Sequence, residues 1–158
     1  MSLERAKAHL AQYGRDADVM EFDSSSATVE LAAEAVGCEP ARIAKTLSFD
    51  MGERVTLIVC AGDARIANPK FKERFGRKAK MLAADEAEER IGHGVGGVCP
   101  FGVNEECDVY LDDSLRRFDV IYPACGSSNS AIALTPEELE TITPNSKWVD
   151  VCKLPETR

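Results

Sequence analysis

Two apolar segments on either side of a short turn constrain the fold more than any other feature of this chain. They span Lys45–Phe49 and Val55–Ala61, and the five residues between them include Gly52. Segments of this length joined by a short glycine-containing connection are typical of a β-hairpin. The sequence therefore predicts two adjacent antiparallel strands in this region.

Capping signals divide the rest of the chain into helices and further strands. Thr28 can cap a helix that stops at Gly37, and Thr135 with Glu138 can form a capping box at the start of a closing helix. The expected helices are residues 2–13, 29–37, 40–44, 68–76, 83–91 and 135 onward; the expected further strands are 19–22, 109–111, 119–122, 131–134 and 148–152. Because these elements lack the regular alternation of a doubly wound fold, they predict the α+β class with a mainly antiparallel or mixed sheet.

The composition indicates one globular unit. The chain has 158 residues, of which 44% are hydrophobic, so we expect a single domain over residues 1–158. No segment approaches the roughly 20 apolar residues of a membrane span, and the first expected helix is charged, unlike a signal peptide. These features predict a soluble, cytoplasmic protein without a membrane partner.

Six cysteines and two histidines are the residues that could bind a metal ion or form disulfides. The cysteines are spread along the chain without a Cys-x-x-Cys pair, and a chain of this size does not need disulfides to fold. With only His9 and His93 as partners, neither a zinc site nor another cofactor is expected. Cys99 and Cys125 lack an evident activating group, so the sequence does not favour a covalent mechanism.

Basic residues are concentrated in one segment of an acidic chain. The net charge of −8 argues against a general DNA or nucleic-acid binder, whose affinity comes from neutralising phosphates. Residues 65–80 nevertheless contain seven basic residues and one acid, so this segment carries +6 and the remainder −14. Such a segment suits a phosphate-bearing partner that docks in one place; a solvated helix face is the alternative. The candidate contacts to a phosphate backbone, which become tRNA contacts under the family resemblance described below, are Lys70, Lys72, Arg74, Arg77 and Lys78.

Lys45 lies at the junction between the expected helix 40–44 and the first strand of the hairpin. Its neighbours Ile43, Ala44 and Leu47 are apolar. An ammonium in a partly apolar pocket is a strong electrostatic clamp for a carbonyl or phosphate oxygen. The alternative is an ordinary surface lysine whose stem packs on apolar surface.

A glycine-rich run, Gly92–Gly102, contains five glycines and a proline and cannot be a helix interior. It lacks the Gly-Lys-Ser/Thr ending of a P-loop and the context of a dinucleotide-binding loop. Two interpretations remain: a nest of backbone donors suited to an oxyanion, or a tight connection with several positive φ angles. His93 is a candidate base here, although a hydrogen-bonding structural role is favoured; His9 lies outside any motif.

Three segments in this order resemble the YbaK/EbsC family, free-standing relatives of the editing insertion of bacterial prolyl-tRNA synthetase. They are Arg42–Leu47, the Gly96-x-x-x-Pro100-Phe101-Gly102 loop, and Pro123–Asn129, and the resemblance is clearest over residues 31–139. It implies a curved, partly closed sheet of six or seven strands with peripheral helices. Where many relatives have a Ser-Ala-Gly-Arg-Arg-Gly-like stretch, residues 124–130 carry small hydroxyls and an amide instead of cations. We therefore expect a polar, neutral pocket edge, which leaves the aminoacyl specificity open.

The resemblance also implies a function, hydrolysis in trans of a small amino acid such as Cys or Ala wrongly esterified to tRNA, with tRNA(Pro) the first expectation. A synthetase pocket discriminates one missing methylene by only about 1–3 kcal/mol, so a second sieve is needed. In this family the glycine–proline loop lines the pocket around the ester, which carries over to Gly96 and Pro100. Lys45 would hold the terminal phosphate or polarise the ester, and N–H groups near Gly96 and Gly97 would receive the oxyanion. The further substrate-binding candidates are Thr28, Thr46, Phe101, Gly126, Ser128 and Asn129.

The general base is not evident from the sequence, so a ribose hydroxyl or the substrate side chain is expected to assist the attacking water. Two other function classes stay open. One is a non-catalytic module of the same fold that binds aminoacyl-tRNA or a synthetase, and the other is a hydrolase of another small ester. The expected partners are the 3′ acceptor end of an aminoacyl-tRNA and a prolyl-tRNA synthetase.

Overall fold

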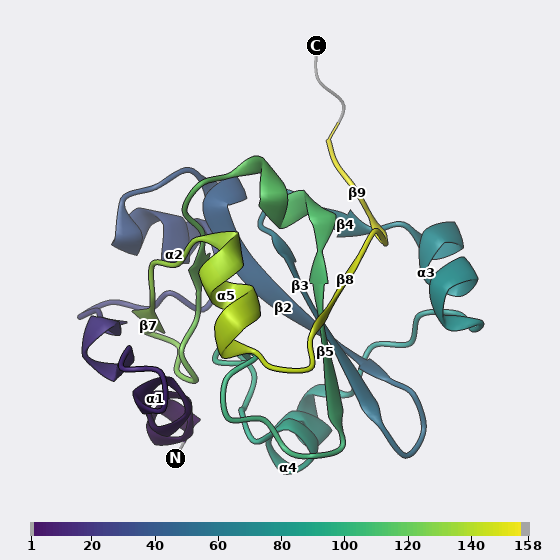
Figure 1. Cartoon of the computed structure of the whole chain (residues 1–158), viewed down its shortest axis with the longest axis horizontal. Helices are drawn as coiled ribbons and strands as arrows, with labels where there is room; N and C mark the ends of the chain where they lie inside the picture. The colour runs from purple at the N-terminus through teal and green to yellow at the C-terminus, as the bar shows by residue number, and fades with distance from the viewer. Residues whose placement is uncertain (1, 156–158) are drawn as a thin grey trace.

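The central sheet of the computed structural model, which describes residues 2–155, has the strand order β6-β2-β3-β5-β8 (Figure 1). The helices are α1 (Ser2–Ala11), α2 (Val29–Val36), α3 (Asn68–Phe75), α4 (Ala87–Ile91) and α5 (Pro136–Ile142). The strands are β1 (Met20–Glu21), β2 (Ile43–Asp50), β3 (Val55–Ala61), β4 (Arg65–Ile66), β5 (Cys107–Asp112), β6 (Tyr122–Pro123), β7 (Ser130–Ala131), β8 (Lys147–Val149) and β9 (Cys152–Lys153). The expected α+β class and mixed sheet are confirmed.

The predicted hairpin forms the centre of this sheet. β2 and β3 pair antiparallel from Ala44 opposite Ala61 to Asp50 opposite Val55, and all of β3 is buried. The other three pairings in the sheet are parallel, and within residues 2–155 the sheet has five strands instead of the expected six or seven. Four further two-residue strands form two separate antiparallel pairs, β1 with β7 and β4 with β9.

One prediction near the site is wrong: residues 40–44 do not form a helix. A single 3₁₀ turn covers Pro40–Arg42, and β2 already begins at Ile43. Ile43 and Ala44 are buried and pair with Tyr122 and Pro123 of β6, so strand pairing prevails over the local helix preference. Lys45 therefore lies inside a strand and not at a helix-to-strand junction.

The outer edge of β2 is paired at both ends but not in the middle. At its start, β6 pairs with Ile43 and Ala44. Near its end, the N–H of Asp50 donates to the carbonyl of Lys80 (2.8 Å), and the N–H of Leu82 donates to the carbonyl of Ser48 (3.0 Å). Within the described part of the chain, no strand pairs with this edge at residues 45–47. This gap positions the candidate site.

Helix α2 begins and ends at its predicted capping residues, and helix α5 begins at its own. Thr28 accepts the N–H of Leu31 at the start of α2, and Gly37 ends this helix with φ 86°. The expected capping box of Thr135 and Glu138 is present at α5. Figure 1 shows α1 and α2 at the left of the sheet and α3 at the far right. No helix within residues 2–155 is long and apolar enough to cross a bilayer.

Candidate functional site

A cleft of about 330 Å³ lies along the open edge of β2. Six consecutive residues of this strand, 43 to 48, line it. Because successive side chains of a strand point to opposite faces, a cleft on one face would be lined by alternate residues only. The backbone edge of β2 therefore forms the floor of the cleft. The other lining residues come from around α2, the segment 81–87, the glycine-rich loop and the β6–β7 region: Ser26, Ala27, Thr28, Val29, Ala32, Met81, Leu82, Ala84, Ala87, Val95, Gly96, Val98, Tyr122, Ala124, Ser130 and Ala131.

Lys45 is the single charged side chain among the lining residues that the structure describes. Its half-buried ammonium donates to the carbonyl of Gly62 (3.2 Å), the residue after β3 ends. An ammonium carries three donors, so this contact fixes its position and leaves two N–H groups for a ligand. No carboxylate or imidazole lies among the described lining residues, which leaves this cation unneutralised at the cleft.

Gly96 and Gly97 are adjacent but play different structural roles. Gly96 lines the cleft with φ 93°, and a Cβ built on it would lie 3.5 Å from the Cβ atoms of Ala27 and Ser128. The N–H of Gly97, in contrast, already donates to the carbonyl of Gly94 (3.0 Å) within a turn. The predicted use of the Gly97 N–H as an oxyanion donor is therefore not supported by its geometry.

Three predicted site residues, Pro100, Phe101 and Gly126, are buried and do not line the cleft. Phe101 is fully buried in the core. Gly126 is buried with φ 88°, and a Cβ there would clash with the carbonyl oxygen of Ser2. A Cβ on Gly97 would in turn lie 2.7 Å from the backbone of Gly126. Phe101, Gly126 and Gly97 are therefore part of the packed framework that holds Gly96 at the cleft.

The third motif attaches the segment before α2 to the cleft rim. The side-chain amide of Asn129 donates to the carbonyl of Phe22 (3.0 Å), and the carbonyl of Asn129 accepts the N–H of Phe22 (2.8 Å). The carbonyl of Ser128 accepts the N–H of Ser26. Asn129 therefore has a positioning contact and does not line the cleft. Thr28 does line it, while its hydroxyl caps α2.

Sequence reasoning missed several cleft residues. Ser26 and Ser130 are buried and line the cleft. The Ser130 hydroxyl accepts a hydrogen bond from the Ser127 hydroxyl (2.6 Å). Met81 and Val95 line its mouth and are strongly exposed, 57% and 71%. Ser26 and Met81 belong to no motif and reach the cleft only through tertiary packing, whereas Val95 lies within the glycine-rich run Gly92–Gly102. Ser130 directly follows the third motif, which was the one available signal.

His93 and Cys99 are close but are not arranged as an activated nucleophile. The imidazole Nε2 of His93 donates to the carbonyl of Phe101 (2.6 Å) and lies 3.5 Å from Cys99 Sγ. Burial lowers the pKa of His93 and raises the pKa of Cys99 to about 12. A neutral thiol facing the donor nitrogen of a neutral imidazole cannot supply a thiolate at neutral pH. The structural role of His93 favoured by the sequence agrees with this geometry.

His9 was placed outside any motif by the sequence, yet it contacts the glycine-rich loop. Its Nδ1 accepts the N–H of Gly102 (3.0 Å), and its Nε2 bonds the carbonyl of Ile142 in α5. The imidazole thus joins α1, α5 and the end of the loop. Within residues 2–155, no group of three or more His, Cys, Asp or Glu side chains is arranged to hold a metal ion.

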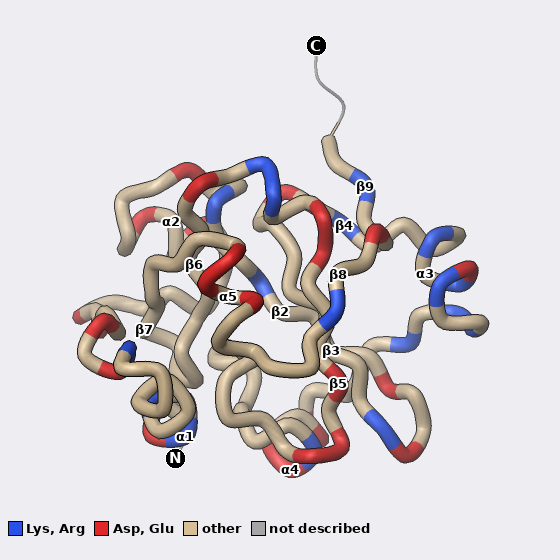
Figure 2. Tube along the Cα trace, in the orientation of Figure 1, with Lys and Arg blue, Asp and Glu red and all other residues tan. Residues whose placement is uncertain are grey.

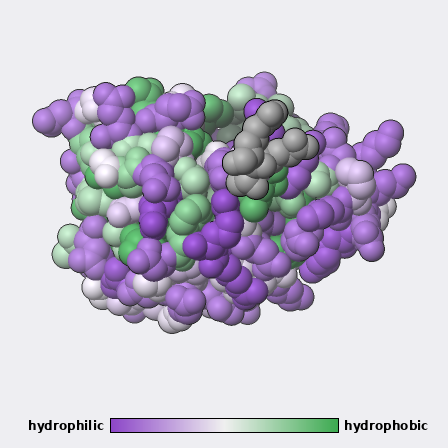
Figure 3. All heavy atoms as spheres, turned by 90° about the horizontal axis from the view of Figure 1, so that it is seen from above, coloured by the Kyte–Doolittle hydropathy of each residue, from purple (hydrophilic) through white to green (hydrophobic). Residues whose placement is uncertain are grey.

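The basic segment lies on and around α3, where Figure 2 shows Lys and Arg residues gathered at the right of the molecule. This side of the surface is strongly hydrophilic in Figure 3. Three of the five predicted tRNA contacts have structural partners: Lys70 with Asp150 (2.9 Å), Arg77 with the carbonyl of Met51 (3.2 Å), and Arg74 over the Tyr110 ring. Among the described residues, only two of the predicted tRNA contacts are exposed without a polar or aromatic partner. These two are Lys72 and Lys78.

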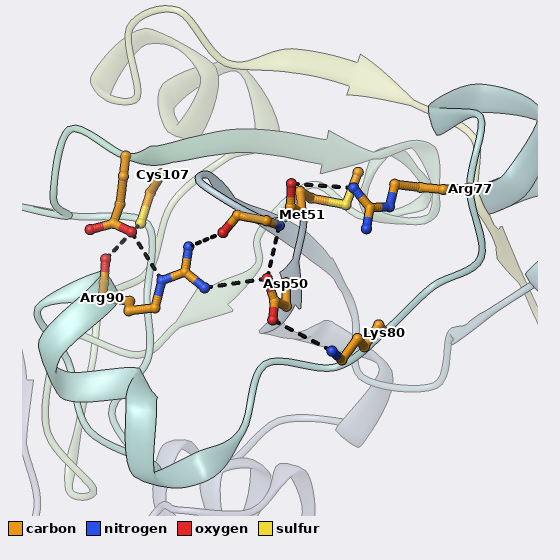
Figure 4. A network of polar contacts seen from close by, with 8 residues as sticks. Asp50, Met51, Arg77, Lys80, Arg90 and Cys107 are labelled. Carbon is orange, nitrogen blue, oxygen red and sulfur yellow. Dashed lines mark hydrogen bonds and ion pairs between the residues drawn. The ribbon is translucent and has the colours of Figure 1, made fainter.

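A polar network fixes the segment after α3 against the end of β2 (Figure 4). The Arg90 guanidinium contacts Asp50 (3.3 Å), Glu106 (3.0 Å) and the carbonyl of Gly52 (2.7 Å). The Gly52 N–H, followed by Arg90, lowers the pKa of Asp50 below its usual value. Lys80 adds a longer contact to the same carboxylate (3.9 Å). The network therefore holds the strand end that closes one side of the gap in β2.

Comparisons with known proteins connect this cleft to a family. The sequence model of one protein family, the aminoacyl-tRNA editing domain, matches residues 23–142. The chain is 54% identical to the uncharacterized protein YwhH of Bacillus subtilis, over 97% of this chain and 98% of that protein. It is 27% identical to the "Putative Cys-tRNA(Pro)/Cys-tRNA(Cys) deacylase EbsC" of Enterococcus faecalis, over 78% and 76% of the two chains.

Solved structures give the same result. The fold superimposes with a TM-score of 0.86 on the crystal structure of "a putative trans-editing enzyme for prolyl tRNA synthetase", at 29% identity over 96% of this chain and 97% of that one. The hypothetical protein APE2540 matches with a TM-score of 0.78 at 26% identity, over 92% and 99% of the two chains. The match of the family model over most of the chain establishes the relationship. The chain belongs to the aminoacyl-tRNA editing domain family, of the YbaK/EbsC type.

Proposed function

We propose that this protein is a trans-acting deacylase that hydrolyses the ester of a small amino acid, such as Cys or Ala, wrongly attached to tRNA, with tRNA(Pro) the first candidate. The observation that carries the proposal is the cleft on the β2 edge, in which Lys45 is the single charged side chain among the described lining residues. We further propose that residues 1–158 form one editing domain, since the family model covers residues 23–142 within it.

The volume of the cleft favours a small aminoacyl group. Ligand pockets commonly measure about 300–1,000 Å³, so about 330 Å³ holds an amino acid and part of the terminal nucleoside. Ala32, Ile43, Leu82 and Ala87 provide buried apolar walls that limit the size of the side chain. The exposed side chains of Met81 and Val95 at the mouth give the terminal adenine an apolar surface.

The chemistry assigned to this cleft is attack of water on the ester carbonyl. The water oxygen bonds to the carbonyl carbon, the bond from that carbon to the ribose oxygen breaks, and the ribose oxygen takes a proton. Lys45 would hold the terminal phosphate or polarise the carbonyl, and the N–H of Gly96, which has no partner among the described residues, would donate to the oxyanion. Because the described lining residues include no carboxylate or imidazole, the free hydroxyl of the ribose is the proposed proton carrier.

The tRNA body would meet the basic segment around α3. Lys72 and Lys78 are its proposed phosphate contacts, because the other predicted cations already have structural partners. A prolyl-tRNA synthetase is a further candidate partner, since proline–tRNA ligase of Geobacillus matches 73% of this chain at 26% identity. In that comparison this chain spans 21% of the ligase.

The decisive experiment is deacylation of a panel of mischarged tRNAs by the purified protein: Ala, Cys and Ser on tRNA(Pro), each compared with noncognate tRNAs. Release of the amino acid faster than spontaneous hydrolysis for one member supports the proposal. A protein that binds these tRNAs without changing any rate would be a binding module of the same fold. The missing base among the lining residues is the observation that favours this second candidate.

A further inference from the structure

The main chain of Thr46 faces the gap in the edge of β2. In a strand, the N–H and C=O of one residue point to the same side, and residues two apart share that side. The N–H of Asp50 and the carbonyl of Ser48 both bond the segment 80–82, on the side away from β3. Thr46 is two residues before Ser48, so its N–H and C=O also point away from β3. Neither group has a hydrogen-bond partner among residues 2–155.

The unpaired N–H and C=O of Thr46 lie inside the cleft, and contacts on both sides of the gap fix their position. Pro123 pairs with Ala44 on one side of the gap, and the contact of Leu82 with Ser48 closes the other side. The Arg90 network with Asp50 (Figure 4) keeps the second contact in place. Thr46 is half-buried and lines the cleft. A half-buried donor and acceptor on one rigid residue are ready to pair with a ligand that carries the complementary groups.

An aminoacyl ester carries those groups. Its α-ammonium is a donor and its carbonyl is an acceptor on the next carbon, which is the arrangement of a single residue in an antiparallel strand. We propose that the aminoacyl group binds as a one-residue strand on the β2 edge, with its α-ammonium donating to the Thr46 carbonyl and its ester carbonyl accepting from the Thr46 N–H. This inference rests on the proposed function and specifies how its substrate is recognised.

The direction of the strand supports this orientation. In residue 46 the N–H precedes the C=O, so an antiparallel ligand places its carbonyl toward Lys45 and its ammonium toward Ser48. Gly62 follows Ala61, which pairs with Ala44, so the Lys45 ammonium is bound near the start of β2. The two positive charges are thereby kept apart, and the ester carbonyl lies on the side of Lys45. The Thr46 N–H also provides the donor that Gly97 cannot supply.

Recognition through Thr46 would read the α-amino group and leave the choice of side chain to the apolar walls. It predicts that the protein prefers aminoacyl esters to other small esters of the same size. Propionyl-tRNA differs from alanyl-tRNA by the α-amino group alone. Because the α-ammonium also activates the ester in solution, each enzymatic rate is divided by the spontaneous rate of the same ester. The wild-type protein should accelerate hydrolysis of propionyl-tRNA about 10- to 100-fold less than that of alanyl-tRNA, as expected for loss of one charge-assisted hydrogen bond.

Two measurements test the assignment on the full-length protein. The first is the amide NMR shift of Thr46 on titration with 3′-alanylamido-3′-deoxyadenosine, a non-hydrolysable mimic of the aminoacyl end. The second is kcat/KM for alanyl-tRNA after replacing Thr46 with its α-hydroxy acid, which exchanges this N–H for an oxygen; the Lys45 carbonyl that the ester also weakens points toward β3 and not into the cleft. The control is Thr46→Val, which keeps both backbone groups and removes the side-chain hydroxyl. We expect a downfield amide shift, a loss of about 100-fold in the backbone variant and a much smaller loss in the control.

The outcomes separate this inference from the proposed function. A wild-type protein that deacylates tRNA while the Thr46 amide does not shift and the backbone variant keeps full activity would overturn the inference alone. A protein that deacylates nothing but shows the Thr46 shift would uphold the inference and turn the proposed enzyme into a binding module. A protein that neither deacylates nor binds the mimic overturns both.

Discussion

The ammonium of Lys45 lies 3.2 Å from the carbonyl oxygen of Gly62, so the one charged group among the described cleft residues is anchored to the end of the central strand β3. This contact orients the lysine without neutralising it, because a carbonyl has no formal charge. The cation thus remains available to an ester or phosphate oxygen in a cleft whose walls are mostly apolar.

Replacing Lys45 should remove activity and preserve the fold. We expect Lys45→Ala to lower kcat/KM for a mischarged tRNA by about 100-fold or more, because a preorganised charge contact is lost. Its melting temperature should stay close to that of the wild type, since among residues 2–155 the side chain makes a single, half-buried hydrogen bond. Lys147→Ala is the matched control, since it changes an exposed lysine of β8, at the opposite edge of the sheet from the cleft. A folded Lys45→Ala protein with undiminished kcat/KM would refute the role given to this residue.

The sequence predicted the local secondary structure near the site better than the pairing between segments that are distant in the chain. The hairpin, the cap at Thr28 and the capping box at Thr135 depend on local patterns, and all three are confirmed. The strand start at Ile43 was missed because it is decided by pairing with β6, far along the chain. The gap beside Thr46 could not be read from the sequence for the same reason, since it exists only where two distant segments stop pairing.

The motifs located the cleft region but did not separate lining residues from their supports. Lys45, Thr46, Thr28 and Gly96 line the cleft. Phe101 and Gly126 lie in the same motifs but support it without lining it, because a loop that must pack on α1 needs glycines and buried anchors as well as ligand-facing groups. A sequence motif alone does not distinguish the residues that line a cleft from those that support its walls.

Gly96 and Gly52 offer a matched pair that separates catalysis from backbone strain. Both have φ near +90° (93° and 91°), and a Cβ on either would meet no atom closer than 3.5 Å. Each change to Ala should cost about 1 kcal/mol of stability. We expect only Gly96→Ala to lower kcat/KM as well, because this residue lines the cleft. Equal activity of the two variants, measured beside their thermal melts, would make Gly96 a purely structural residue.

Gly97 should behave differently from its neighbour. A Cβ there would lie 2.7 Å from the backbone of Gly126, so Gly97→Ala must displace one of the two loops. We expect a loss of stability of about 1–3 kcal/mol, the usual cost of overpacking. Chemical denaturation measures this loss. A Gly97→Ala protein as stable as the wild type would show that the two backbones separate easily and that the framework is softer than its packing suggests.

The Asp50 network should make stability depend on pH. Its carboxylate has a lowered pKa in the folded state, so its contribution is fully present above the unfolded pKa and is lost as pH falls through the folded value. Asp50→Asn should therefore destabilise the protein at pH 7 and have a smaller effect near pH 3. The measurement is the free energy of unfolding of both proteins at the two pH values. The same destabilisation at both would exclude a role for the charge.

The basic segment provides the last prediction, and the structure narrows it to two lysines. Lys72 and Lys78 are exposed, and the described residues give neither of them a partner, so reversing both charges should disturb no folded contact. If they meet tRNA phosphates, Lys72→Glu with Lys78→Glu should raise KM for tRNA and flatten its dependence on salt, because fewer counterions are released. A minimal aminoacyl-adenosine ester is too short to reach α3, so its hydrolysis should be unchanged.

Lys70→Glu is an informative contrast, since it breaks the ion pair with Asp150 and should alter stability. Plots of log KM against log salt that coincide for the wild type and the double variant would show that the tRNA body binds elsewhere, while the chemistry assigned to the β2 edge would be unaffected.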